Sequence, residues 1–223
     1  MSLGVASLAV SLAPLGSVLA QDPGEQQRLI DRARIVVEEF QADPNFANVP
    51  IYVQNAYAVL IVPEMLQGGL ILGAEYGVGV LLARDPQSGA WGDPAFYEIW
   101  GGSIGLQIGG RSSDVLFTLM NAEAVDKLLT TSFKLGADAS MALGAIGAGV
   151  GAGTTVRFGE DLYVFARAQG LYGGLALDGS VVQEREEWNE AYYGVGVSAR
   201  QILRGELGPQ PGAAELRAAL GRF

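Results

Sequence analysis

Two apolar runs that are rich in glycine stand at the centre of the chain, at residues 69–82 and 95–109. Within each run, apolar side chains recur at every second position, which is the period of a β-strand and not of a helix. Residues 84–93, between the runs, are rich in the turn formers Pro, Gly, Ser and Asp. Glycines inside strands mark bends, bulges or the close approach of another backbone. We therefore predict a β-hairpin at the middle of a strongly curved, partly barrel-like sheet.

Segments with strand periodicity continue on both sides of this hairpin. Further strands are predicted at residues 56–62, 113–120, 161–168 and 170–177. Pro63 is expected to end the first of them. Residues 135–153 consist mainly of small residues, which we expect to let two backbones pack closely. Two alternatives stay open for this stretch: a hairpin that inserts into a membrane, and a space that admits a lipid chain.

The clearest helix is predicted at residues 24–41, with Asp22 as its N-cap and Pro23 at its first position. One face of this helix is apolar and consists of Leu29, Ala33, Val36, Val37 and Phe40. The other face carries Arg28, Arg32 and Arg34 together with Asp31, Glu38 and Glu39. Because the charges balance, we expect the helix to cover the open side of the sheet. A helix that contacts lipid through its basic residues is the alternative.

Shorter helices are predicted at residues 51–55, 121–131, 198–203 and 213–220. The chain length and the 49% share of hydrophobic residues suit one domain with a substantial core, which we place at residues 21–223. The predicted fold class is therefore α+β, with an antiparallel sheet of about seven to eight strands and helices at the N- and C-terminal ends.

The composition excludes several kinds of chemistry. The chain contains no cysteine and no histidine, which rules out thiol and serine–histidine nucleophiles, disulfides, and thiolate or imidazole metal sites. Residues 147–152 read Gly-x-Gly-x-x-Ala, but no helix follows, as a dinucleotide site requires. The acidic residues 184–190 have no nucleophile beside them and are expected to be a solvated surface. We expect no catalytic residues, no cofactor and no metal, and hence a protein that is not an enzyme.

Charge and the N-terminal sequence bear on partners and location. The net charge of −10 disfavours nucleic acid as a partner and weakens electrostatic docking on anionic membranes. Residues 1–20 carry no charge and end in small residues at Ala20, which is typical of a secretory signal peptide. We predict cleavage after Ala20 and a periplasmic or secreted protein. An uncleaved membrane anchor formed by the same residues is the alternative.

Several short motifs together carry a family resemblance. They are Ala58-Val-Leu-Ile-Val-Pro63, Gly68-Gly-Leu-Ile-Leu-Gly73, Tyr76-Gly-Val-Gly-Val80, Gly101-Gly-Ser-Ile-Gly-Leu-Gln-Ile-Gly109, Gly136-Ala-Asp138, the run at residues 164–179, and Tyr192-Tyr193-Gly194. In order and spacing, from about residue 28 to about residue 220, the chain resembles the SYLF domain. That family comprises lipid-binding modules, alone in bacteria and fused to other modules in eukaryotes, where relatives bind phosphoinositides and actin.

The resemblance implies an exported, non-enzymatic lipid-binding module that acts at a membrane surface. The candidate lipid-binding residues are Arg28, Leu29, Arg32, Arg34, Val36 and Phe40. Trp91 and Trp100 are expected to pack beside glycines, with membrane-interface anchoring as the alternative. Actin is not expected as a partner of an exported chain. The rival hypothesis is a structural or protein-interaction module of the cell envelope that uses the curved, glycine-rich sheet. The lipid and the oligomeric state stay open.

Overall fold

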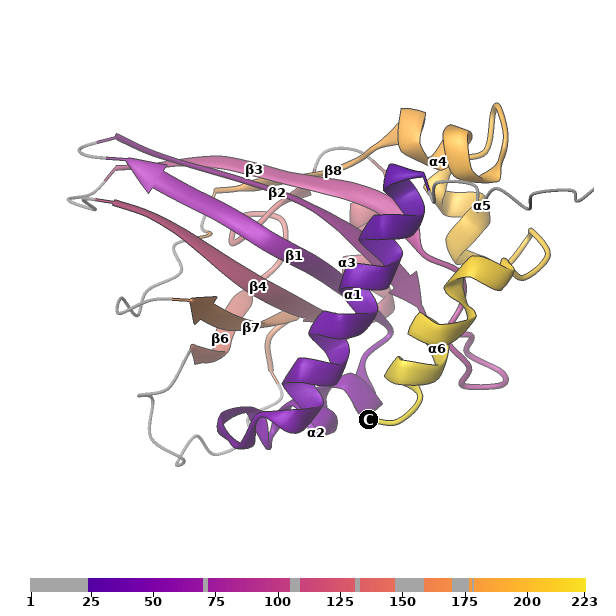
Figure 1. Ribbon diagram of the computed structural model, residues 1–223, viewed down its shortest axis with the longest axis horizontal. Coiled ribbons are helices and arrows are strands. Elements are labelled where there is room, and N and C mark those ends of the chain that lie inside the picture. Colours follow the sequence, from indigo (N-terminus) through magenta and orange to yellow (C-terminus); the bar gives the residue numbers. More distant parts are fainter. Residues whose placement is uncertain are drawn as a thin grey trace, which may run out of the picture.

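The computed structural model describes residues 24–69, 72–104, 109–130, 133–146, 159–169, 177 and 179–223. The strands are β1 (Ala58–Gly69), β2 (Leu72–Ala83), β3 (Ala95–Ile104), β4 (Gly109–Leu119), β5 (Phe133–Lys134), β6 (Met141–Ile146), β7 (Leu162–Gln169) and β8 (Val181–Glu184). The helices are α1 (Glu25–Ala42), α2 (Val49–Asn55), α3 (Ala122–Leu128), α4 (Glu186–Tyr193), α5 (Ala199–Leu203) and α6 (Ala214–Leu220), with the 3-10 turns η1 (Pro44–Phe46) and η2 (Pro211–Ala213). Strands therefore fill the middle of the described chain and helices its two ends (Figure 1).

The eight strands form one sheet in the order β5-β8-β3-β2-β1-β4-β7-β6. Neighbouring strands are antiparallel, except that β6 and β7 run parallel. The predicted α+β fold with a strongly curved, partly barrel-like sheet is thus confirmed. The parallel pair was not predicted. Parallel strands require a connection longer than a hairpin turn, and the sequence separation between the end of β6 at Ile146 and the start of β7 at Leu162 allows one.

Apolar side chains alternate along the strands and supply two cores, one on each face of the sheet. On the face that we call the α1 face, Val80 and Phe96 pack with α1, α2 and α6. On the opposite, α3 face, Leu81 and Tyr97 pack with α3 and α5. Figure 1 shows α1 crossing the strands beside α6, while the far ends of β1, β2, β3 and β4 extend beyond it. Part of the α1 face is therefore not covered by α1.

The predicted N-terminal helix is confirmed, because α1 buries its apolar stripe against the sheet. Its N-cap is Gly24; the predicted cap, Asp22, lies outside the described residues. The predicted helices near residues 51–55, 121–131, 198–203 and 213–220 correspond to α2, α3, α5 and α6. Asn121 caps α3 by accepting a hydrogen bond from the Ala124 N–H, and Ser198 forms a capping box with Gln201 at α5.

The first strand of the sheet continues beyond Pro63, where the sequence predicted its end. Between Ile61 and Leu66, the register of β1 against β2 shifts by one residue, and Glu64 adopts a left-handed φ of 58°. This combination is a β-bulge. The prediction was wrong because a proline interrupts a regular ladder but is accommodated at a bulge, where no ladder hydrogen bond is required of it.

Two more predictions need correction. Gly109 begins β4 and does not end the preceding strand. Most of the acidic segment 184–190 belongs to helix α4 and is not simply a solvated surface, because Asn189 is completely buried. The predicted strand at residues 161–168 corresponds to β7. Residues 1–20, 147–153 and 170–176 lie outside the described residues, and so do the predicted signal peptide and nearly all of the predicted strand at residues 170–177.

Candidate binding surface

Three large apolar side chains stand side by side on the uncovered part of the α1 face. Leu66 of β1 pairs with Tyr76 of β2, which pairs with Trp100 of β3. Their exposed fractions are 56%, 44% and 46%. We call these three residues the apolar row. Single exposed apolar residues are common on proteins, but a contiguous set in register on neighbouring strands marks a candidate contact surface.

The bulge in β1 places Leu66 in this row. Ile61 packs in the α1-face core, and a regular strand would turn the residue five positions later to the opposite face. The extra residue between Ile61 and Leu66 returns the side chain of Leu66 to the α1 face, where it lies beside Tyr76. A feature that breaks the strand period thus completes the row.

Beyond the apolar row lies a second row of small residues. Gly110, Gly68, Ala74 and Gly102 are neighbours in the register of β4, β1, β2 and β3. Because these residues project little or nothing from the sheet, the surface is hollowed there. The hollow has a volume of about 540 Å³ and is bordered by Leu66, Tyr76 and Ser112. The small residues therefore form the floor of an open, shallow groove.

A second cavity, of about 480 Å³, lies between the start of α1 and the apolar row. Arg28, Leu29 and Arg32 border it on the side of the helix, and Leu66 and Tyr76 on the side of the sheet. Both cavities share Leu66, Tyr76 and Ser112, so they form one continuous groove along the α1 face. We call it the α1 groove.

The charges at the α1 groove are largely paired. Arg32 Nη1 lies 2.6 Å from Glu64 Oε2, and both side chains are 61% exposed. An exposed pair of this kind contributes only about 0.5 kcal/mol to stability. Burial is the main cause that raises the pKa of Tyr76 above its ordinary value. The tyrosine is therefore neutral at physiological pH, and its ring acts as an apolar surface with one polar tip.

The six residues that were predicted to bind lipid do not all lie at the α1 groove. Arg28, Leu29 and Arg32 border the α1 groove. Arg34 does not border it and pairs instead with Glu38, at 2.6 Å. Val36 and Phe40 are 4% and 1% exposed and belong to the core between α1 and the sheet. Only three of the six are therefore placed where a ligand on this face would contact them.

The apolar row was not predicted from the sequence, although one of its members, Trp100, was considered as a membrane-interface anchor. Trp100 was expected to pack, but it is half exposed, whereas Trp91 is buried as expected. Tyr76 was recognised only as part of a strand. The signal in the sequence was the Met65-Leu66 pair, which breaks the period-two pattern after Pro63. If that break is interpreted as a bulge, Leu66 is placed on the same face of the sheet as Tyr76.

Within the described ranges, no three His, Cys, Asp or Glu residues are grouped so as to hold a metal ion. In the same part of the chain, no helix combines the length and the apolar character needed to cross a bilayer. What the geometry does offer on the α1 face is an open apolar surface with polar borders.

Comparison with known proteins decides the family. The model of the Ysc84 family, described as "Las17-binding protein actin regulator", matches residues 100–223, which is more than half of the chain. The chain belongs to the Ysc84 family. This confirms the resemblance to the SYLF domain. It also corrects one expectation: the dismissal of actin as a partner was wrong, because the family itself is described as an actin regulator.

Several curated proteins are similar to this Ysc84-family chain. SH3 domain-containing YSC84-like protein 1 of Rattus norvegicus is 30% identical over 168 residues, covering 75% of this chain and 49% of the relative. The Xenopus laevis protein of that name is 30% identical over 177 residues, covering 78% and 52%. Protein YSC84 of Saccharomyces cerevisiae is 28% identical over 168 residues, covering 74% and 36%. The chain thus spans about half the length of the vertebrate relatives and less of the yeast one.

Proposed function

We propose that this chain is a non-enzymatic binding module that docks on a membrane surface through the α1 groove. The observation that carries the proposal is the apolar row, three half-exposed large side chains in register beside a floor of small residues. An acyl chain or the interfacial region of a bilayer fits such a surface, because the small residues leave room and the row supplies apolar contact. The membership in a family of non-catalytic binding domains supports the non-enzymatic part of the proposal.

Apolar contact outweighs head-group attraction in this arrangement. Side chains of this size bury roughly 150–250 Å² each, so three half-exposed ones offer on the order of 300 Å². At about 25 cal/mol per Å², that area is worth at most about 7 kcal/mol before the entropic cost of binding. Each arginine near an anionic surface contributes about 1 kcal/mol. Arg32 is paired with Glu64, and the net charge of −10 opposes approach. We therefore expect binding that depends little on salt.

The double variant Leu66→Thr/Trp100→Thr tests the proposal. Threonine keeps the strand propensity of both positions while it removes most of their apolar area. We expect less of the variant to float with vesicles of phosphatidylcholine and anionic phosphatidylglycerol, corresponding to at least about tenfold weaker binding, since every 1.4 kcal/mol is a factor of ten. Wild-type binding should be nearly the same at about 0.1 M and 0.5 M salt, because screening acts on charges and not on apolar contact.

The matched control is Ile51→Gln/Tyr57→Thr. These two residues are also 41% and 51% exposed, but they lie in and after α2, at the opposite end of β1 from the row. The control should float as the wild type does. Binding that is abolished by high salt or by Arg28→Glu/Arg32→Glu, yet is retained by the threonine variant, would contradict the proposal. It would show that the head-group mechanism operates instead.

A protein partner is the second candidate, and the family description favours actin as that partner. The same apolar row would then be part of a protein interface. Co-sedimentation with actin filaments, using the two double variants above, separates the candidates. A loss of co-sedimentation in Leu66→Thr/Trp100→Thr, with vesicle binding absent in the wild type, would assign the groove to a protein.

We further propose that the module acts outside the cytoplasm, as the uncharged residues 1–20 indicate. The expected mature protein begins at Gln21. Intact-mass measurement of the protein purified from the producing cell checks this. A mass that includes Met1 would contradict cleavage and favour an anchor formed by the same residues.

A further inference from the structure

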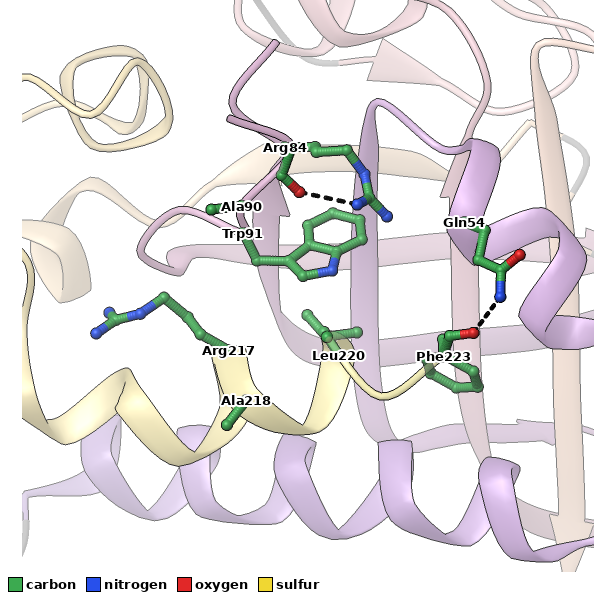
Figure 2. Close-up of a pocket in the computed structure, with 10 residues that line it drawn as sticks. Gln54, Arg84, Ala90, Trp91, Arg217, Ala218, Leu220 and Phe223 are labelled. Carbon is green, nitrogen blue, oxygen red and sulfur yellow. Dashed lines mark hydrogen bonds between the residues drawn. The ribbon is translucent and has the colours of Figure 1, made fainter. Parts of the chain in front are cut away.

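A separate pocket of about 460 Å³ lies at the opposite end of β2 from the apolar row. Figure 2 shows it between helix α6, the connector that joins β2 to β3, and Gln54 at the end of α2. Its apolar walls are formed by the ring of Trp91, by Leu220 and by Phe223. The volume lies within the range of small-molecule sites. The proposed membrane-binding function makes no use of it.

Arg84 is held rigidly at this pocket. Its guanidinium donates to three backbone carbonyls, those of Val53 (2.9 Å), Ala56 (3.2 Å) and Gly89 (2.9 Å). Its Cζ also lies 4.2 Å from the ring centroid of Trp91. A guanidinium has five N–H groups, so these three bonds leave two for another acceptor. Within the described residues Arg84 has no carboxylate partner, and burial lowers its pKa.

Trp91 presents an unsatisfied donor at the same place. The residue is 7% exposed, and its indole Nε1 is buried with no hydrogen-bond partner in the described part of the protein. Figure 2 shows this nitrogen on the edge of the ring that faces Leu220 and Phe223, the apolar wall of the pocket. An indole N–H buried without an acceptor has lost its hydrogen bonds to water with nothing in exchange. A ligand that supplied an acceptor there would restore a hydrogen bond.

The charge of the pocket selects the kind of acceptor. The charged side chains that line it are two arginines, Arg84 and Arg217, with no lining carboxylate side chain. Arg217 already pairs with Asp93 and donates to the Gln210 carbonyl. Of the two lining arginines, Arg84 is therefore the one without an ion-pair partner in the described residues. Indole and guanidinium groups are donors only, and a ligand must therefore be an acceptor. An acceptor that is also negatively charged gains most beside an unmatched guanidinium.

We propose that this pocket binds a carboxylate that is attached to an apolar or aromatic group. One carboxylate oxygen would accept from the Trp91 indole N–H and the other from the free edge of Arg84. The apolar group would lie against Leu220 and Phe223. A carboxylate is preferred to a phosphate, because a single charge costs less to bring against apolar walls than a double one. The source of the carboxylate is either a free small acid or the C-terminus of a polypeptide.

The indole N–H signals of the full chain, observed by proton–nitrogen NMR, test the proposal directly. The chain has three tryptophans, and the signal of Trp91 is assigned by its loss in Trp91→Phe. On titration with 3-phenylpropionate we expect that signal to move downfield and saturate, while those of Trp100 and Trp188 stay in place. The neutral analogue 3-phenylpropanamide should bind at least about tenfold more weakly, because it lacks the charge-assisted hydrogen bond.

Trp188 supplies the matched control variant. It stacks under Arg185, whose Cζ lies 4.1 Å from the ring centroid, but it borders the α1 groove and not this pocket. Trp188→Phe should therefore bind 3-phenylpropionate as the wild type does. Trp91→Phe keeps an aromatic ring under Arg84 and should lose about tenfold in affinity, measured by calorimetry on protein shown to be folded by circular dichroism.

A peptide that ends in phenylalanine distinguishes the two sources. Binding of the free-acid peptide at least about tenfold tighter than 3-phenylpropionate, with no binding of the amidated peptide, assigns the pocket to a polypeptide C-terminus. Binding of the small acid alone assigns it to free acids. The proposal is overturned if no acid shifts the Trp91 signal in folded protein, or if acid and amide shift it equally. Neither result bears on vesicle binding at the α1 groove.

Discussion

Replacing Gly79 by alanine is expected to lower the free energy of unfolding by about 3 kcal/mol, because the new methyl group has no space. A Cβ at this position would lie 2.5 Å from the carbonyl oxygen of Ile61 and 2.8 Å from Cγ2 of Val62. The nearer atom is backbone and cannot rotate away. Alanine also restricts the unfolded chain, which would stabilise the protein by only about 0.4–1 kcal/mol. The steric clash is therefore the larger effect, and the net change in the free energy of unfolding is a loss of stability.

The close approach at Gly79 is a consequence of the bulge in β1. Gly77 and Gly79 of β2 both face Val62, which lies where the register of β1 begins to shift. The extra residue presses the bulged backbone toward β2 on the α3 face. Glycines in the neighbouring strand leave the volume that the bulge needs. The same bulge places Leu66 in the apolar row, so these glycines indirectly support the candidate binding surface.

Urea unfolding of Gly79→Ala and Gly208→Ala measures the effect. A Cβ on Gly208 would meet no atom within 4 Å, so this control should change stability by less than about 0.5 kcal/mol. Gly89 is a poor control despite its open surroundings, because its φ of 73° strains any other residue. Equal midpoints for the two alanine variants would show that β1 does not approach Gly79 in solution.

Local sequence patterns predicted the elements but not all of their relations. The hairpin of β2 and β3 and the helices α1, α2, α3, α5 and α6 follow from period, caps and turn residues, which act over a few positions. The parallel pairing of β6 with β7 depends on contacts between segments that lie apart in the sequence, and local period carries no information on it. The same limit explains why the eight-strand order was not predicted.

The candidate site shows where period alone misleads. A period-two reading places Leu66 away from Tyr76, and only the bulge reverses this. In α1, the helical period identified the apolar face correctly, but a stripe that faces the sheet is not free to bind a ligand. Val36 and Phe40 are buried for that reason. A pattern of apolar residues therefore identifies a face, and the three-dimensional structure decides whether that face is core or surface.

Asn189 carries the second large expected effect, and it also shows how a polar segment can be structural. Its side chain is completely buried at the junction of α4 with the sheet. Its Oδ1 accepts from the Phe96 N–H at 2.8 Å, and its Nδ2 donates to Glu184 Oε1 at 3.0 Å. The same Glu184 oxygen accepts from the N–H of Ala199, at the start of α5. One amide thus connects β3, β8 and two helices.

The variant Asn189→Leu is expected to lower the free energy of unfolding by about 3 kcal/mol or more. Leucine has the same branching as asparagine but bulkier methyl groups, so overpacking adds to the loss from the polar groups left unsatisfied: the buried Phe96 N–H and the Glu184 carboxylate, at about 1–3 kcal/mol each. The control is Asn55→Leu, at an exposed helical position with a single hydrogen bond to the Ile51 carbonyl. It should change stability by less than about 0.5 kcal/mol.

The variant Asn189→Asp separates the acceptor role from the donor role through pH. The new carboxyl still accepts from the Phe96 N–H, but when ionised it faces Glu184 with a like charge in place of a donor. Its pKa in the folded protein is therefore raised above its unfolded value. A raised carboxyl pKa favours folding while the group is protonated, so the stability lost at pH 7 relative to wild type should diminish as the pH falls toward about 4. Urea midpoints of variant and wild type across that range measure the difference. A deficit that stays constant with pH would show that Asn189 does not donate to Glu184.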